Sequence, residues 1–236
     1  MIETMDEKDA VPGAESNAVS DIVHGTESKV VSGVVCSAES NDLSGNMASD
    51  ASSAMSSAAN SIVSGAIDAK KREDLERQGY RIVGNHSAIK VCDWSKKSLK
   101  GEGVCYKESF YGLQCHRCVQ MTPAMHVCGH RCKWCWRDID FTLPEWEGVI
   151  DSPKDIVDGC IDEHVKYLHG FGGNSKVPKD KLSMAYSPLH FAISLSGEPT
   201  AYPYLPELIK EVRSRGMTAF LVTNGTNPGM LRRIAD

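Results

Sequence analysis

Three cysteines stand close together in this sequence, at Cys128, Cys132 and Cys135, separated by three and then by two residues. Three thiolates on one tight loop can bind three irons of a cubane iron–sulfur cluster, which leaves the fourth iron without a protein ligand. An open coordination position of this kind is where a chelating cofactor can bind. Trp134, just before the last of these cysteines, can cover such a cluster and limit its contact with water. The spacing therefore predicts an iron–sulfur cluster that has one iron free for a cofactor.

Zinc is the alternative ligand for part of this region. Cys115 and Cys118 form one C-x2-C pair, and Cys132 and Cys135 form another after 13 intervening residues. That arrangement is close to a zinc-ribbon pattern, and a non-enzymatic zinc-binding module that recognises RNA would be its simplest use. A zinc site leaves three further cysteines of the region without a role: Cys92, Cys105 and Cys128.

The cysteine content also bears on the compartment. Seven of the nine cysteines lie between Cys92 and Cys135. The N-terminus shows no basic segment followed by an apolar one, and no run of about 18 apolar residues is present to span a membrane. We therefore expect a cytoplasmic protein without a membrane partner, in which clustered cysteines bind metal or do chemistry.

Composition divides the chain into two parts. Residues 1–69 contain no Phe, Tyr or Trp and carry 11 acidic against 2 basic side chains, whereas residues 70–236 carry 20 acidic against 24 basic ones. A stretch without large side chains cannot bury enough apolar area to offset the entropy of ordering it, so residues 1–69 are predicted to be a disordered tail. The body is mildly basic, which is compatible with a nucleic-acid partner but is a weak signal.

Helices and strands are predicted to alternate after the cysteines. Apolar residues recur with a period near 3.6 after Pro153, which predicts a helix, while residues 92–135 are expected to hold few regular elements and 170–181 to be a polar loop. Four further elements are predicted: a helix over 70–78, a strand over 189–195, a helix over 204–215 and a strand over 218–222. This repetition predicts an α/β fold with a parallel sheet or barrel. About three strand–helix units cannot close a barrel, so we expect an incomplete barrel and a truncated chain.

Two of the predicted strands end in polar turns. Ser196-Gly197-Glu198-Pro199 follows the first, and Thr223-Asn224-Gly225-Thr226 follows the second. The carboxyl ends of parallel strands are where α/β folds bind ligands. A strand end exposes backbone acceptors, and Glu198 can add a carboxylate for an ammonium group. A simple turn is the alternative interpretation of Gly-Glu-Pro taken alone.

The cysteine motif and the first of these turns resemble two motifs of a known enzyme superfamily. C-x3-C-x2-C with an aromatic residue before the third cysteine resembles the signature of the radical S-adenosylmethionine (SAM) superfamily, and Ser196-Gly197-Glu198 resembles its Gly-Gly-Glu motif, with serine in place of the first glycine. The resemblance implies a partial TIM-barrel-like (β/α) fold over residues 120–236 and a [4Fe–4S] cluster on the three cysteines of the motif. It also implies a set of SAM-binding residues: Ser196, Gly197, Glu198 and Asn224.

Three segments upstream make the resemblance more specific. Val91-Cys92-Asp93-Trp94, Val104-Cys105-Tyr106-Lys107 and Arg117-Cys118-Val119-Gln120-Met121-Thr122-Pro123 closely resemble the 4-demethylwyosine synthases, the radical SAM enzymes of wybutosine biosynthesis. The resemblance implies that residues 70–119 form a cysteine-rich extension carrying a second [4Fe–4S] cluster. Its ligands would be Cys92, Cys105 and Cys118. Lys107 would be the catalytic lysine that forms a Schiff base with pyruvate, since an amine beside a cationic cluster region can have a lowered pKa and attack a ketone.

The resemblance also implies a reaction and its partners. A carbon–carbon lyase of this family converts N1-methylguanosine, next to the anticodon of phenylalanine tRNA, to 4-demethylwyosine with pyruvate as the two-carbon donor. The base must leave the anticodon-loop stack to reach the site. Residues 1–69 are too short and polar for the flavodoxin-like domain of eukaryotic members, so we expect an archaeal-type enzyme with a separate electron donor. A different radical SAM enzyme, such as a glycyl-radical activator, is the further alternative, and Lys107 with the second cysteine set argues against it.

Overall fold

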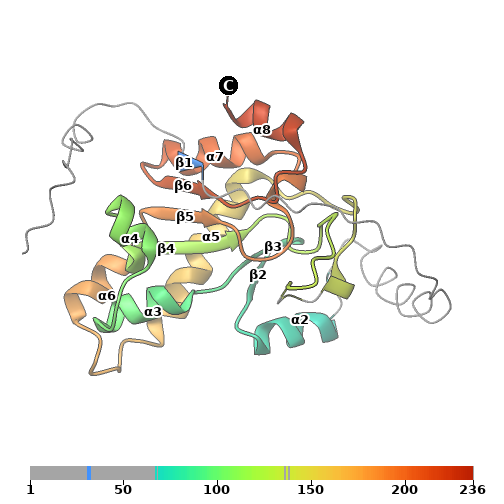
Figure 1. Ribbon diagram of the computed structural model, residues 1–236. Helices are drawn as coiled ribbons and strands as arrows, with labels where there is room; N and C mark the ends of the chain where they lie inside the picture. The colour runs from blue at the N-terminus through green and yellow to red at the C-terminus, as the bar shows by residue number, and fades with distance from the viewer. Residues whose placement is uncertain (1–30, 33–66, 68, 136, 138, 236) are drawn as a thin grey trace, which may run out of the picture.

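The structure is a computed structural model that describes residues 31–32, 67, 69–135, 137 and 139–235 (Figure 1). Val31–Ser32 form a short strand, β1, inside the segment predicted to be a disordered tail. The remainder of that prediction, for residues 1–30, 33–66 and 68, lies outside the described residues.

A mixed sheet forms the centre of the described structure, with the strand order β1-β6-β5-β4-β3-β2. β4, β5 and β6 run parallel to one another, as predicted for the last two, whereas β2 and β3 form an antiparallel hairpin that continues antiparallel onto β4. The connection from β2 to β3 is only three residues long, and so short a connection can only reverse the chain direction. The other five strands are β2 (Arg81–Val83), β3 (Ser87–Ile89), β4 (Cys118–Thr122), β5 (His190–Ile193) and β6 (Thr218–Leu221). The predicted incomplete barrel stays a prediction.

Helices follow or precede these strands in the chain. The helices predicted around 70–78, after Pro153 and over 204–215 are confirmed, while the expectation of a loop over 170–181 missed α6. None of the helices in the described part of the chain has the length and apolar character needed to cross a membrane. The helices are α2 (Ala69–Arg77), α3 (Asp93–Lys100), α4 (Tyr106–Tyr111), α5 (Pro153–His169), α6 (Lys179–Ala185), α7 (Leu205–Ser214) and α8 (Pro228–Ala235).

The prediction that residues 92–135 hold few regular elements is wrong, because α3, α4 and β4 lie there. Cys92 caps α3, with its Sγ accepting a hydrogen bond from the backbone N–H of Ser95, and Gly101 ends the helix with a left-handed φ of 72°. Cys105 precedes α4, which ends at Gly112 in the same way. Helices of eight and six residues are too short for apolar periodicity to reveal them.

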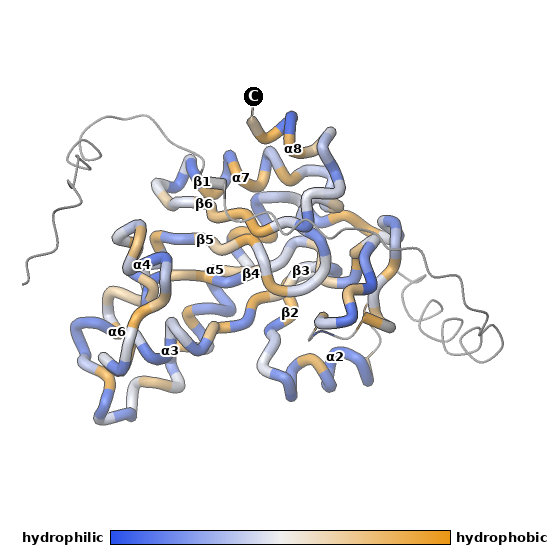
Figure 2. The backbone as a smooth tube through the Cα atoms, viewed as in Figure 1, coloured by the Kyte–Doolittle hydropathy of each residue, from blue (hydrophilic) through white to orange (hydrophobic). Residues whose placement is uncertain are grey.

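The parallel strands present two different faces, because successive side chains point to opposite sides of a sheet. One face buries Val119, Met121, Phe191 and Ile193 in the main hydrophobic core with residues of α5 and α7. Figure 2 shows hydrophobic residues along these strands. Burial of one such side chain stabilises the fold by about 1.5–3 kcal/mol. The opposite face carries the candidate functional residues, and we call it the site face.

Candidate active site

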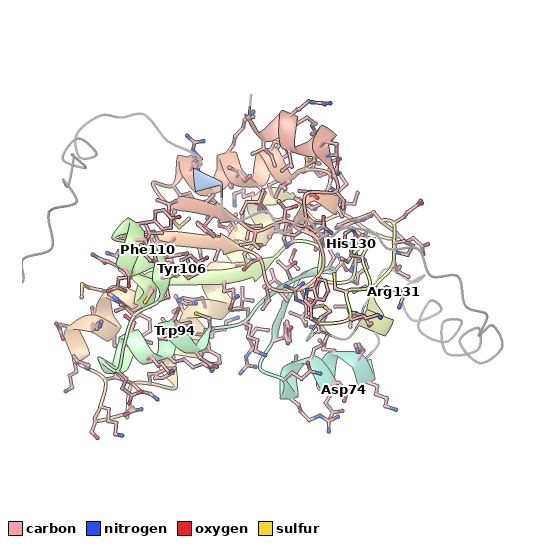
Figure 3. All side chains as sticks on the ribbon, in the orientation of Figure 1. Asp74, Trp94, Tyr106, Phe110, His130 and Arg131 are labelled. Carbon is pink, nitrogen blue, oxygen red and sulfur yellow. The ribbon has the colours of Figure 1, made fainter. Side chains whose placement is uncertain are left out.

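The first group of candidate residues lies at the amino end of β4. Lys107 Nζ lies 3.6 Å from Cys118 Sγ and 5.1 Å from the centre of the Phe220 ring. The thiols of Cys92 and Cys105 are close enough to act on the charge of Lys107. The structure therefore brings all four predicted residues together, and we call Lys107, Cys92, Cys105 and Cys118 the lysine group. In Figure 3 the labelled Trp94, Tyr106 and Phe110 mark its α3–α4 side, across the molecule from His130 and Arg131.

Regular elements hold the lysine group in place. Two of its cysteines precede the first turns of α3 and α4, and the third begins β4. Burial favours the neutral amine of Lys107, but the charges on Cys118 and Cys105 outweigh it, so the pKa of Lys107 is raised. The expected lowering of this pKa concerns an amine beside a bound cluster and stays a prediction, because thiol groups are the nearest titratable neighbours of Lys107 in this structure. Burial raises the pKa of the Cys118 thiol to about 11.

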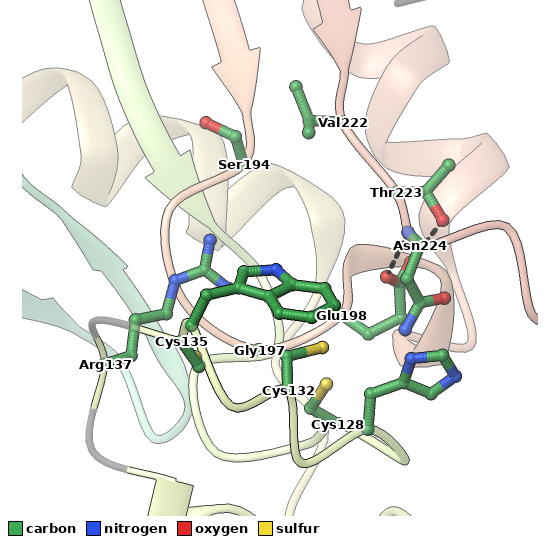
Figure 4. A pocket seen from close by; sticks show the side chains of 12 residues that line it. Cys128, Cys132, Cys135, Arg137, Ser194, Gly197, Glu198, Val222, Thr223 and Asn224 are labelled. Carbon is green, nitrogen blue, oxygen red and sulfur yellow. Dashed lines mark hydrogen bonds between the residues drawn. The ribbon is translucent and has the colours of Figure 1, made fainter. Parts of the chain in front are cut away.

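The second group borders a pocket of about 210 Å³ at the carboxyl ends of β5 and β6 (Figure 4). The segment from Cys128 to Cys135, which we call the cysteine loop, contributes all three predicted thiols to its wall. The pocket is lined by Cys128, His130, Cys132, Trp134, Cys135, Arg137, Ser194, Gly197, Glu198, Val222, Thr223 and Asn224. Three thiols around one opening fit the soft donor set that an iron–sulfur cluster requires.

Gly197 explains how the cysteine loop meets the turn after β5. A Cβ on Gly197 would lie 1.7 Å from the carbonyl oxygen of Ala124, and its φ of +69° is one that side chains rarely adopt. The next residue, Glu198, donates its backbone N–H to the carbonyl of Val127 at 2.7 Å. Only glycine permits this approach, so the motif position holds the chain just before Cys128 in place.

Glu198 is committed to the protein itself. Its buried carboxylate accepts hydrogen bonds from the backbone N–H and hydroxyl of Thr200, from the Thr223 hydroxyl at 2.6 Å and from the backbone N–H of Asn224 at 2.8 Å. It joins the turns that follow β5 and β6. The predicted contact to a ligand ammonium would therefore have to share an occupied carboxylate, and that role stays a prediction.

The other two predicted cofactor residues differ in their exposure to the pocket. Ser196 is buried, donates its hydroxyl to the Met125 carbonyl and is absent from the pocket lining. Asn224 lines the pocket, and its Nδ2 is buried without a hydrogen-bond partner among the described residues. An unpartnered buried amide donor costs about 1–3 kcal/mol, which a ligand with an acceptor would recover. Asn224 thus fits a polar cofactor.

The zinc-ribbon pairing does not form in the described residues. Cys115 Sγ lies 3.9 Å from the Trp94 carbonyl, while Cys118 contacts Lys107 at the amino end of β4. Cys132 and Cys135 border the pocket at the opposite end of the parallel strands. Across the described part of the chain, no three Cys, His, Asp or Glu side chains converge on a site for a single metal ion.

Several pocket residues were missed by sequence reasoning. Ser194 and Val222 lie just after the last residues of β5 and β6, on the site face. The alternation of side chains along the predicted strands could have pointed to Ser194 and Val222. His130 and Arg137 could not have been placed, because no regular element orients the segment that carries them.

The fold and this site define an α/β protein with a thiol-lined pocket at the carboxyl edge of parallel strands. No protein-family model matches the chain. The chain is homologous to proteins named S-adenosyl-L-methionine-dependent tRNA 4-demethylwyosine synthase, which confirms the resemblance seen in the sequence. The protein of Pyrococcus horikoshii is 47% identical over 163 residues, covering 69% of this chain and 48% of that protein. The Oryza sativa protein is 42% identical over 69% of this chain and 25% of its own length.

Solved structures agree with the sequence comparisons. A structure of TYW1 with a lysine–pyruvate adduct bound has a TM-score of 0.65 and 37% sequence identity, covering 71% of this chain and 55% of that one. The crystal structure of archaeal TYW1 has a TM-score of 0.59 at 36% identity, covering 71% and 56%. The chain thus spans about half the length of these structures and of its archaeal relatives.

Proposed function

We propose that this chain carries the catalytic site of a tRNA 4-demethylwyosine synthase, which converts N1-methylguanosine to 4-demethylwyosine with pyruvate as the two-carbon donor. The observation that carries this proposal is the position of Lys107. Its amine lies 3.6 Å from Cys118 Sγ, on the same sheet face as a pocket bordered by three more thiols. A relative with a lysine–pyruvate adduct supports the same chemistry.

The thiols would hold two [4Fe–4S] clusters. Cys128, Cys132 and Cys135 would bind the first beside SAM, and the other three cysteines of the lysine group would bind the second. When bound, the first cluster and SAM supply the radical that removes hydrogen from the N-methyl group, with an electron from a separate electron donor. Asn224 Nδ2 would donate to SAM, and Gly197 would hold the cysteine loop against the turn after β5.

Lys107 would act on the second substrate. Its neutral amine attacks the C2 carbonyl of pyruvate, water leaves, and the Schiff base fixes the two-carbon unit beside the pocket. The methylene radical of the base would add to C2 of the Schiff base, and homolysis of the C1–C2 bond would release the carboxylate as a CO2 radical anion, which leaves as formate after taking up a hydrogen atom or as CO2 after giving up its electron. The exocyclic amine of the guanine would then displace the lysine nitrogen at C2, which closes the third ring and frees Lys107. Phe220 and Tyr106 border the lysine and limit its contact with water.

Reductive trapping tests this function. The chain is reconstituted anaerobically with iron and sulfide, mixed with pyruvate and treated with borohydride, and the adduct is located by peptide mass spectrometry. We expect an adduct on Lys107 and none in Lys107→Arg, together with formation of the tricyclic base in phenylalanine tRNA by the unaltered chain only. An adduct distributed over surface lysines, or purely zinc-bound protein, would contradict the proposal.

A further inference from the structure

Gln120 lies between the lysine group and the pocket on the site face. Cys118 is two positions before it on β4, and side chains two apart share one face at a separation of about 7 Å. On the pocket side, Gln120 Nε2 donates to Ser194 Oγ at 3.5 Å, and Ser194 lines the pocket. A molecule that touches both groups must therefore pass over Gln120.

On the β5 and β6 side, the row that contains Gln120 is apolar. Its register partner on β5 is Ala192, which pairs in turn with Phe220 on β6, and both are buried. A glutamine amide has two N–H donors and an acceptor oxygen. The Gln120 side chain makes one hydrogen bond within the described structure, at the long end of the range. Most of its hydrogen-bonding capacity is thus unused at a half-buried position, where a ligand would complete it.

We propose that Gln120 is a specificity-determining residue that binds the edge of the unstacked purine base. This inference rests on the proposed function. The new carbon–carbon bond joins the N-methyl carbon of the base to pyruvate held on Lys107, while hydrogen is removed from the pocket side. The base must then lie between the two groups, above Gln120. An amide side chain offers a donor and an acceptor side by side, which matches the N3 acceptor and the neighbouring N2–H donor of N1-methylguanine.

Two measurements separate this role from others. The first is the affinity of an anticodon stem–loop RNA that carries N1-methylguanosine, compared with the same RNA carrying an abasic residue at that position. The second is borohydride trapping of pyruvate on Lys107, which needs no RNA. The variants are Gln120→Leu and the volume-conserving Gln120→Met, with Gln78→Leu as the control because Gln78 is exposed just beyond α2.

We expect the unaltered chain and Gln78→Leu to prefer the base-containing RNA by about tenfold, and both Gln120 variants to lose most of that preference while trapping pyruvate normally. A full base preference in Gln120→Met would overturn the inference. Weakened pyruvate trapping with base preference intact would also overturn it and assign Gln120 to the keto acid. Absence of trapping in the unaltered chain would instead contradict the proposed function.

Discussion

The lysine group and the cysteine loop each present three thiols, but the fold holds them in opposite ways. In the lysine group, the thiols of Cys105 and Cys118 are each 5% exposed, and helix starts and a strand start fix their positions. The cysteine loop contains no helix or strand residue between Cys128 and Cys135, and its thiols are partly exposed. Backbone contacts hold it from outside, such as Cys128 N–H to the Leu143 carbonyl at 2.8 Å.

This difference corresponds to two kinds of task. A residue that forms a covalent bond to substrate gains from a fixed position, because misplacement by about 1 Å can cost 10²-fold in rate. A loop beside an open pocket can admit a large cofactor before the site closes around it. Under the proposed function, the lysine group would serve as a rigid nucleophile site, and the cysteine loop as a cofactor site that depends on the turns around it.

Cysteine replacement should separate the two groups most sharply. Cys118→Ala and Cys128→Ala should each lose about half of the reconstituted iron, because each set would hold its own four-iron cluster. Only Cys128→Ala should also lose SAM cleavage. Cys115→Ala is the control and should keep its iron, since Cys115 Sγ faces the Trp94 carbonyl. Iron analysis and deoxyadenosine measurement decide this, and complete loss of iron from either single variant would show that the groups are one unit.

Two glycines test the dependence of each group on its backbone. Gly197→Ala should lower the free energy of unfolding by about 4 kcal/mol or more, because its Cβ would overlap the Ala124 carbonyl. Gly101→Ala, at the opposite end of α3 from Cys92, has a similar φ of +72° but nothing within 4 Å. It should cost only about 1 kcal/mol. Urea unfolding measures both changes in the free energy of unfolding. Equal changes in the two variants would show that the two regions do not differ in their dependence on the backbone.

Lowering the pH should destabilise the lysine group and the cysteine loop together. Burial lowers the pKa of His164 in α5 to about 4, and α5 packs against β4, which begins at the lysine group and leads toward the cysteine loop. Between about pH 6.5 and pH 4 the unfolded chain takes up a proton that the folded chain does not, so the free energy of unfolding falls with pH by about 3 kcal/mol. The full contribution of His164 to the free energy of unfolding is present above about pH 6.5.

His164→Leu should make this part of the pH profile less steep, as measured by urea unfolding at several pH values. Hydrogen exchange at β4 and at the cysteine loop follows the two regions separately. If the cysteine loop lost its protection from exchange at a clearly higher pH than β4, another titrating group would control the loop.

The smallest effect is expected at the exposed aromatic residues. Trp134 is 75% exposed and lines one wall of the pocket, and its role in covering a cluster stays a prediction. Trp134→Ala should change the free energy of unfolding by less than about 0.5 kcal/mol but weaken SAM binding several-fold. Phe110→Ala on α4, 79% exposed, is the matched change on the other side and should alter neither quantity. Thermal unfolding and equilibrium SAM binding provide the comparison, and equal SAM affinities in the two variants would contradict it.

The sequence by itself determined the features that depend on near neighbours in the chain. The spacing of Cys128, Cys132 and Cys135 places three thiols on one loop whatever the rest of the fold does. The helix after Pro153 and the strands around 190 and 220 also follow from local patterns of apolar residues. The resemblance upstream of Cys128 marked Lys107 and its three cysteines as one set, but it could not show their arrangement.

Only the tertiary structure decided which groups face each other across long separations in sequence. It placed Lys107 against Cys118, used the Glu198 carboxylate to join two strand ends, and left Asn224 Nδ2 without a partner at the pocket. It also formed α3 and α4, whose few residues carry too little periodicity to be recognised. The first two of these contacts join residues 11 and 25 positions apart in the chain, and contacts over such distances have no signature in the local sequence.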